Sequence, residues 1–197
     1  MFVKKIKNQM ANIFFTSDHH FGHENIIKFC NRPFKDAREM NEELIKRWNE
    51  KIKPNDHVYH LGDFGLTYKE NLAQIIDQLN GKIYLIVGNH ESATLQNRKK
   101  FEWVKEYFEL KVKDPDGQGG YQRIMLFHYA MRTWRGEGRG NWHLYGHSHG
   151  NLPDLEDKYS FDIGVDNHDF YPLSYDEVKA IMQTKKWVSG YERNKEN

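Results

Sequence analysis

Side chains that bind divalent cations recur in five short blocks along this chain. Carboxylates, imidazoles and amide oxygens together suit borderline and hard divalent metals. The blocks hold more donors than one ion needs, and their number suits two ions that share a bridging carboxylate. Two such ions about 3.5–4 Å apart are a known means of attacking phosphate esters. In chain order the blocks are Asp18-x-His20, Gly62-Asp63, Gly88-Asn89-His90, His128 and Gly146-His147-x-His149.

The spacing within the blocks fits such a site. In an extended segment, residues two apart face the same side, so Asp18 and His20 are expected to point together. A glycine stands directly before a ligand-type residue at positions 62, 88 and 146. Because glycine permits sharp turns and a close approach of the backbone, we expect the chain to bend tightly at these three positions.

The blocks follow predicted strands. Asp18, Asp63, Asn89 and His128 each come shortly after a run of β-branched and aromatic residues. Open α/β sheets place their ligand sites outside the carboxyl ends of strands, so these four side chains are expected to converge in space. The predicted strands cover residues 12–16, 57–61, 82–87, 110–113, 121–127, 143–145 and 161–165.

Apolar residues three and four positions apart predict the helices. Met40, Leu44 and Trp48 follow this spacing in a helix predicted over 36–53, with Asp36 as its N-cap. Helices and strands alternate early, and strands dominate later, which favours an α/β sandwich over a helix bundle. The other predicted helices lie around residues 72–79 and over residues 98–108 and 176–183.

With the five blocks in this order over residues 18–149, the chain resembles the calcineurin-like metallophosphoesterase family, in particular its small bacterial or phage-type members. The resemblance implies an α/β fold built as a four-layer β-sandwich flanked by helices. It also implies hydrolysis of phosphoric esters by in-line attack of a hydroxide that bridges two divalent metals. Manganese is the favoured metal, and Fe, Zn, Ni or Co also suit these donors.

The resemblance assigns a role to each motif residue. His90 would lie beside the substrate, as a general acid toward the leaving oxygen or as a stabiliser of charge. The expected metal ligands are Asp18, His20 and His149 for the first ion, Asn89, His128 and His147 for the second, and Asp63 as the bridge between them.

The expected substrate is a nucleotide-like phosphodiester, such as a cyclic nucleotide or a nucleic-acid end. His90 favours a diester because it can protonate a poor leaving group. An arginine-rich loop between the last two blocks points the same way, since arginine forks suit phosphate. We take Arg132 and Arg139 of this loop as candidate substrate-binding residues, with Trp134 and Trp142 as candidate stacking partners. The alternative is a solvated basic loop whose tryptophans anchor it to the core.

Other functions stay open. A phosphomonoesterase or a nucleoside-polyphosphate hydrolase would use the same site, and a non-catalytic metal-binding scaffold is the alternative of another class. The residues from Gly146 to Gly150 also match the G-x-S-x-G elbow of serine hydrolases around Ser148. That elbow is followed by a helix, and Pro153 argues against one here.

The remaining histidines divide into two groups. Four flank the blocks, and each could orient a ligand or simply pack in the core: His19, His23, His57 and His60. The other two, His143 and His168, are expected to be structural.

Length and composition bound these expectations. At 197 residues the chain is expected to form one domain, with a polar lead-in over residues 1–10 and a loosely held tail over 187–197. Lys and Arg number 29 against 28 Asp and Glu, so tight binding of duplex nucleic acid is not expected. The single cysteine, Cys30, excludes a disulfide scaffold and fits a cytoplasmic location. No apolar run is long enough for a membrane helix, and no signal peptide is expected.

Overall fold

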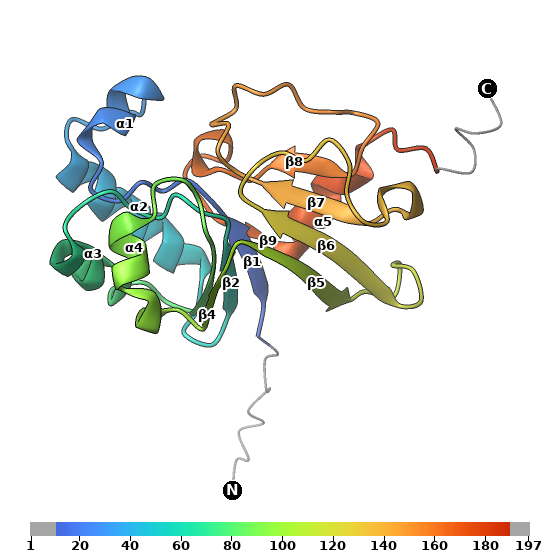
Figure 1. Ribbon diagram of the computed structural model, residues 1–197, viewed down its shortest axis with the longest axis horizontal. Coiled ribbons are helices and arrows are strands. Elements are labelled where there is room, and N and C mark those ends of the chain that lie inside the picture. The colour runs from blue at the N-terminus through green and yellow to red at the C-terminus, as the bar shows by residue number, and fades with distance from the viewer. Residues whose placement is uncertain (1–10, 190–197) are drawn as a thin grey trace, which may run out of the picture.

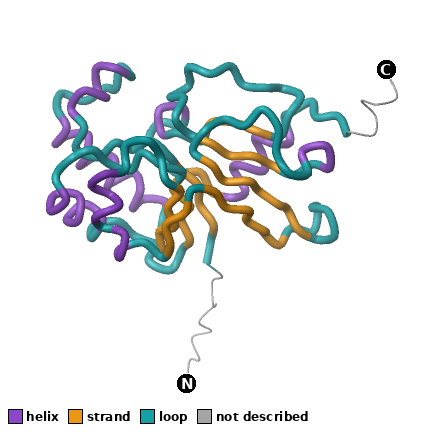
Figure 2. The backbone as a smooth tube through the Cα atoms, in the orientation of Figure 1, coloured by secondary structure: helices purple, strands orange, loops and turns teal. Residues whose placement is uncertain are grey.

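The computed structural model describes residues 11–189, so the predicted lead-in over residues 1–10 lies outside the described residues. Two β-sheets pack face to face at the centre, and helices flank them (Figures 1 and 2). This arrangement confirms the predicted α/β sandwich flanked by helices. Within residues 11–189, every helix is too short or too polar to span a bilayer.

The first sheet has five strands in the order β4-β3-β2-β1-β9. The first four of these are parallel, and β9 runs antiparallel to β1. Parallel strands bring their carboxyl ends to one edge, which is where the predicted site must form. The strand bounds are β1 Ile13–Thr16, β2 His57–His60, β3 Lys82–Ile86, β4 Trp103–Lys105 and β9 Leu173–Ser174.

The second sheet has four strands in the order β5-β6-β7-β8. A hairpin pairs the first two antiparallel, and β6, β7 and β8 are mutually parallel. The carboxyl ends of these three strands therefore share an edge as well. The bounds are β5 Tyr107–Lys113, β6 Tyr121–Phe127, β7 Trp142–Tyr145 and β8 Ser160–Asp162.

Two hydrophobic clusters hold the layers together. Phe14 packs between the first sheet and the helices outside it, whereas its neighbour Phe15 packs between the sheets, because successive strand residues face opposite sides. Val178 and Met182 add one helix to the inner cluster. The helices are α1 Glu24–Phe29, α2 Ala37–Lys51, α3 Lys69–Ile76, α4 Ser92–Gln96 and α5 Tyr175–Gln183.

A loop covers part of the outer face of the second sheet. Trp134 and Trp142 are both buried, at 9% and 5% exposure. The Trp134 ring packs on His143, and its indole N–H donates to the Asn141 carbonyl at 2.8 Å. Trp134 therefore anchors the loop to the core, Trp142 packs in the cluster between the sheets, and the expectation that they stack on a bound base is wrong. A short 3-10 turn, Glu137–Arg139, lies within the loop.

The helix predicted over residues 98–108 is wrong. Only a 3-10 turn, Arg98–Lys100, forms there, and the chain then enters β4 and β5. Trp103 and Val104 pair with Tyr84 and Leu85 of β3, so their preference for strands is realised at the open edge of the first sheet. Helices α1 and α4 and the short strand β9 were not predicted, and the strand predicted over 161–165 already ends at Asp162.

The start of the tail is held to the body. The Trp187 ring stacks on Tyr159 at 5.1 Å between centroids, and its indole N–H donates to the Glu137 carbonyl. The expectation of a loosely held tail from residue 187 therefore does not describe Trp187, and residues 190–197 lie outside the described chain.

The N-cap of α2 yields a stability prediction. The Asp36 side chain accepts the Glu39 backbone N–H at 2.8 Å, so Asp36→Ala should lower the free energy of unfolding by about 1 kcal/mol. Arg38→Ala, on the same helix, removes only an exposed ion pair with Glu42 and should leave the free energy of unfolding nearly unchanged. Urea unfolding followed by circular dichroism measures both, and equal effects would contradict the capping role.

Candidate metal centre

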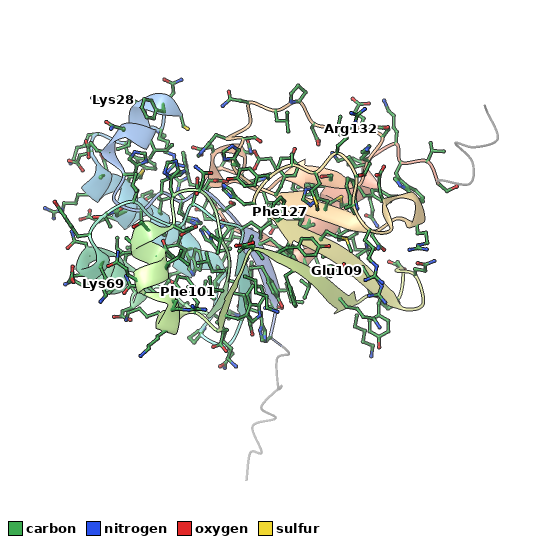
Figure 3. All side chains as sticks on the ribbon, in the orientation of Figure 1. Lys28, Lys69, Phe101, Glu109, Phe127 and Arg132 are labelled. Carbon is green, nitrogen blue, oxygen red and sulfur yellow. The ribbon has the colours of Figure 1, made fainter. Side chains whose placement is uncertain are left out.

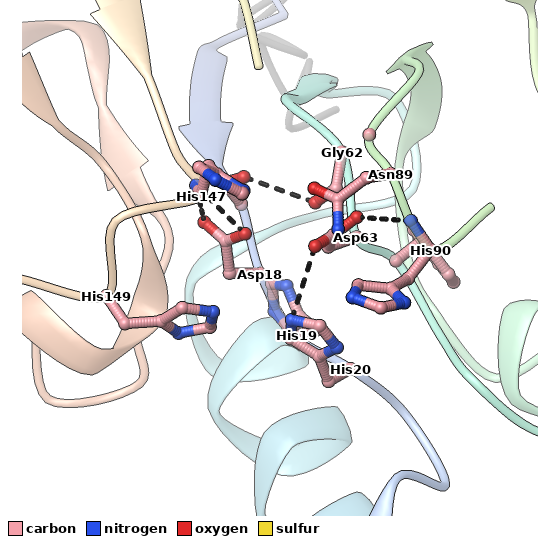
Figure 4. A network of polar contacts seen from close by, with 12 residues as sticks. Asp18, His19, His20, Gly62, Asp63, Asn89, His90, His147 and His149 are labelled. Carbon is pink, nitrogen blue, oxygen red and sulfur yellow. Dashed lines mark hydrogen bonds and ion pairs between the residues drawn. The ribbon is translucent and has the colours of Figure 1, made fainter. Parts of the chain in front are cut away.

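The five sequence blocks meet at the carboxyl ends of the strands, and Figure 4 labels residues from four of them. Residues from four blocks form two groups of donors, and within each group one ligand atom from every residue lies within 4.8 Å of the others. The first group is Asp18, His20 and His149, and the second is Asp63, His128 and His147. Residues more than a hundred positions apart in the chain are thus brought into two adjacent clusters.

Five of these six residues adopt the left-handed backbone conformation. Their φ angles are 59° at Asp18, 52° at His20, 54° at Asp63, 68° at His147 and 46° at His149. That region costs a non-glycine residue roughly 1–2 kcal/mol. Such strain persists only where the surroundings impose it, and it gathers at functional sites. Here the Asp18 N–H donates to the Gly62 carbonyl and the His20 N–H to the Asp63 carbonyl, both at 3.0 Å.

The glycines leave room for the carboxylates, as expected. A Cβ on Gly88 would overlap Asp63 Oδ1. A Cβ on Gly146 would overlap both the Ser17 hydroxyl and Asp18 Oδ2. With no side chain at Gly146, the next backbone N–H, that of His147, reaches Asp18 Oδ2 at 2.9 Å.

The first donor group contains a buried histidine whose ring nitrogens lack partners in the described part of the chain and a buried carboxyl, and both suit a cation. Neither ring nitrogen of His20 has a hydrogen-bond partner among residues 11–189. Burial, followed by the nearby His149, lowers the pKa of His20 to about 2, so its lone pair is free. Asp18 is fully buried, and burial raises the pKa of its carboxyl well above the usual value. Buried charges of this kind are paired or coordinate metals.

The second donor group also presents lone pairs that suit a cation. His128 Nδ1 donates to the Leu61 carbonyl at 2.7 Å, which fixes the tautomer. Burial lowers the pKa of His128, so Nε2 carries a lone pair. That lone pair faces Asn89 Oδ1 at 3.0 Å and Asp63 Oδ2 at 3.6 Å. Three acceptor atoms facing one another suit a cation between them.

His90 lies beside the two groups with its side chain exposed. Its backbone N–H donates to Asp63 Oδ1 at 2.8 Å, which ties its position to that carboxylate. The His90 ring lies 5.6 Å from the ring of His20 and 6.4 Å from that of His23. The side chain is therefore open to a substrate that enters the site.

Two functional residues were missed by the sequence reasoning. Asp166 accepts a hydrogen bond from His149 Nδ1 at 2.7 Å and a two-pronged contact from Arg32 at 2.8 Å for each oxygen. The same guanidinium donates to the backbone carbonyls of Asp18 and His19. Arg32 therefore clamps the strained turn after β1 while Asp166 orients His149. Asp166 follows shortly after β8, so its position at a strand end indicates a site residue. No such pattern marks Arg32 in the sequence.

The Asp166–His149 contact also sets their charge states. Burial alone would lower the pKa of His149, but the hydrogen bond that it donates to Asp166 and the charge of Asp18 raise it above the usual value. Burial alone would raise the pKa of Asp166, but hydrogen bonds from His149 and Arg32 hold it below the usual value. The pair thus behaves as a carboxylate–imidazole unit, as is common behind metal-binding histidines.

The flanking histidines have mainly packing roles. His19 and His60 are fully buried and contact each other at 3.0 Å, and the Gly62 N–H reaches His60 Nδ1 at 3.3 Å. They pack beneath the turn that carries Asp63. His143 has both ring nitrogens bonded to backbone, at Met125 and Met131. The remaining contacts join His57 to Tyr84, His168 to the Asp162 carbonyl, and the ring of His23 to that of His20.

The candidate substrate-binding arginines lie apart from these clusters. Arg132 and Arg139 are exposed, and none of the contacts within residues 11–189 joins either side chain to a donor group. Arg139 instead lines a cavity together with Arg123 and Arg135.

The Asp166 contact generates a test. Asp166→Asn removes the charge behind His149, so we expect binding of Mn²⁺ by the stripped protein to weaken by about 10–100-fold. Asp169→Asn makes the same charge change at an exposed site on the same segment and serves as the control. Isothermal titration gives both affinities, with thermal unfolding to verify the fold. Equal affinities for the two variants would rule out the orienting role.

Known proteins resemble this chain in sequence. Residues 12–161 match the family model for the calcineurin-like phosphoesterase superfamily domain. An uncharacterized protein of Methanocaldococcus jannaschii is 34% identical over 186 residues, covering 91% of this chain and 96% of that protein. The Gene 66 protein of Mycobacterium phage L5 is 26% identical over 163 residues, covering 71% and 78%.

A solved structure shares the fold. The crystal structure of a protein of unknown function from Aquifex aeolicus superposes with a TM-score of 0.64 at 23% identity, covering 87% of this chain and 99% of that one. The family is one of metal-dependent phosphoesterases, and the present chain carries residue clusters able to bind divalent ions. The chain belongs to the calcineurin-like phosphoesterase superfamily.

Proposed function

We propose that this chain hydrolyses nucleotide-like phosphodiesters at a site holding two divalent metals. The observation that supports this most is that one buried carboxylate lies close to the donors of both groups. Asp63 belongs to the second group, and its Oδ2 also lies 3.5 Å from His20 Nε2 of the first. A carboxylate shared in this way suits a bridging ligand.

In this proposal, Asp18, His20 and His149 hold one metal, and Asn89, His128 and His147 hold the other, with Asp63 between them. When bound, divalent cations generate a nucleophile from water near neutral pH and neutralise phosphate oxygens. Manganese is our first choice for reconstitution because the donors combine imidazole with carboxylate and amide oxygens. The chain's own part is to hold these donors in place, with Asp18, His20, Asp63 and His128 buried and His20 neutral.

His90 is assigned to the leaving group. Its exposed ring stands next to the donor groups, and its backbone is held by Asp63. A protonated His90 would donate its proton to the leaving oxygen, which matters most when that oxygen belongs to a poor leaving group. A diester of a sugar alcohol is such a case. Cleavage of monoesters or nucleoside polyphosphates at the same site remains the alternative, to be separated by substrate.

The activity prediction concerns metal-stripped protein refilled with Mn²⁺. We expect hydrolysis of bis(p-nitrophenyl) phosphate to depend on the metal and to exceed that of p-nitrophenyl phosphate. Loss of a hydrogen-bond partner behind a metal ligand costs about 10–100-fold. Because Asp63 is proposed as a ligand itself, Asp63→Asn should lower kcat/KM by more than about 100-fold. Ser148→Ala should leave the rate unchanged. Metal-independent turnover that is lost in Ser148→Ala would instead support a serine hydrolase.

The role of His90 is tested with leaving groups. The p-nitrophenolate group departs without a proton. His90→Gln should therefore have little effect on the hydrolysis of bis(p-nitrophenyl) phosphate. The same change should slow a diester with an alcohol leaving group by about 10²–10⁴-fold. Rates for both substrates in wild type and variant give the comparison. An equal loss on both would contradict proton donation and leave charge stabilisation as the role of His90.

A further inference from the structure

The outer face of the second sheet carries an unbalanced cluster of cations. Lys111 on β5 lies opposite Arg123 on β6. Arg123, Arg135 and Arg139 line one cavity of about 310 Å³, together with Gln118 and Asn141. All three arginines are exposed. We call the cavity that Arg123, Arg135 and Arg139 line the arginine cavity.

Little negative charge offsets this cavity. Arg135 reaches Glu109 at 3.0 Å. Within residues 11–189, neither Arg123 nor Arg139 has a carboxylate within ion-pair distance. The chain as a whole is nearly neutral, yet three guanidinium groups surround this one cavity. The local positive charge therefore suits an anion. The planar forks of arginine match phosphate oxygens.

A line of aromatic rings connects the arginine cavity to the metal centre. The Tyr129 ring contacts the rings of His128 and His147, at 4.8 and 4.7 Å between centroids. The Phe127 ring lies 5.5 Å from that of Tyr129. Tyr129 is 38% exposed, so its ring is available beside the donor groups.

The line continues across the hairpin toward the arginines. Phe127 on β6 lies opposite Tyr107 on β5, which places both side chains on the same face. Tyr107 is also 38% exposed, and its hydroxyl donates to Glu109, the partner of Arg135. Figure 3 labels Phe127, which contacts Tyr129, and Glu109, which pairs with Arg135.

The separation suits a short stretch of chain-like ligand. Arg123 precedes His128 by five positions along β6 and its end, which corresponds to about 16 Å of extended backbone. A single small nucleotide at the metal centre would not reach the arginine cavity. A polymer with repeated phosphates and flat bases would contact both, as in proteins that bind single strands through aromatic platforms and basic grooves.

We propose that the outer face of the second sheet binds a single-stranded nucleic acid whose end enters the metal centre, with bases on Tyr129 and Tyr107 and phosphates in the arginine cavity. This inference rests on the proposed phosphodiesterase function and narrows its substrate. A single strand is favoured over a duplex because its unstacked bases can lie on exposed rings. Three arginines also form a smaller cationic surface than duplex binding usually involves.

The test measures binding and turnover separately. Binding is followed by fluorescence anisotropy with labelled phosphorothioate oligonucleotides of about ten nucleotides, which resist hydrolysis; DNA and RNA versions distinguish the two sources of this chemistry. The main variant is Arg123→Gln/Arg139→Gln. The matched control, Arg38→Gln/Lys46→Gln, removes two exposed cations from α2. Turnover of bis(p-nitrophenyl) phosphate by the same proteins reports on the metal centre alone.

We expect the Arg123→Gln/Arg139→Gln variant to bind the oligonucleotide at least about tenfold more weakly, while turnover of the small diester stays within about twofold of wild type. Each phosphate contact on a single strand contributes about −0.7 to the slope of log K against log salt. The slope should therefore change from about −2 in wild type to about −0.7 in the variant. The control variant should match wild type, and a duplex of the same sequence should bind more weakly.

Two outcomes would overturn the inference while leaving the proposed function intact. In the first, the arginine variant binds the oligonucleotide as wild type does. In the second, wild type turns over the small diester but binds no single strand. If metal-loaded wild type turns over neither diester nor oligonucleotide, the proposed function fails, and the anisotropy measurement still decides whether this face binds nucleic acid.

Discussion

The burial of two carboxylates in one cluster of imidazoles is the constraint on which the site depends. Asp18 and Asp63 are 0% and 2% exposed, and a buried charge is costly unless it is paired. Arg32, the buried cation nearby, directs its guanidinium to the backbone carbonyls of Asp18 and His19 and to Asp166 instead. Arg32 therefore does not pair with either carboxylate directly, and divalent cations between the donor groups would balance their charge.

The backbone around these carboxylates shows what the arrangement demands of the fold. Five site residues hold left-handed φ angles, a conformation that side chains disfavour. The parallel strands β1, β2 and β3 end together, so the turns that follow them can bond to one another. Rigid strands thus position the strained turns, and the turns aim the side chains inward.

The positions of the site residues could be predicted from the sequence because they follow a local rule. Polar residues directly after apolar strands converge at a sheet edge, and Asp18, Asp63, Asn89 and His128 all follow that rule. Arg32 could not be found in this way, because its partner Asp166 lies 134 positions away and only the tertiary fold joins them. The segment after Arg98 has helical spacing but forms strands, because its strand character depends on pairing with β3, which spacing along the chain does not reveal. Likewise, Trp134 is buried because the loop packs on β7, and Trp142 is buried because it faces the cluster between the sheets; neither follows from composition.

The most direct test of the proposed dinuclear site is anomalous diffraction from crystals of the protein loaded with Mn²⁺. We expect two manganese peaks about 3.5–4 Å apart, one beside Asp18, His20 and His149 and the other beside Asn89, His128 and His147, with the Asp63 carboxylate contacting both. A single fully occupied peak in protein that is active, or two peaks that leave Asp63 uncoordinated, would contradict the two-metal arrangement.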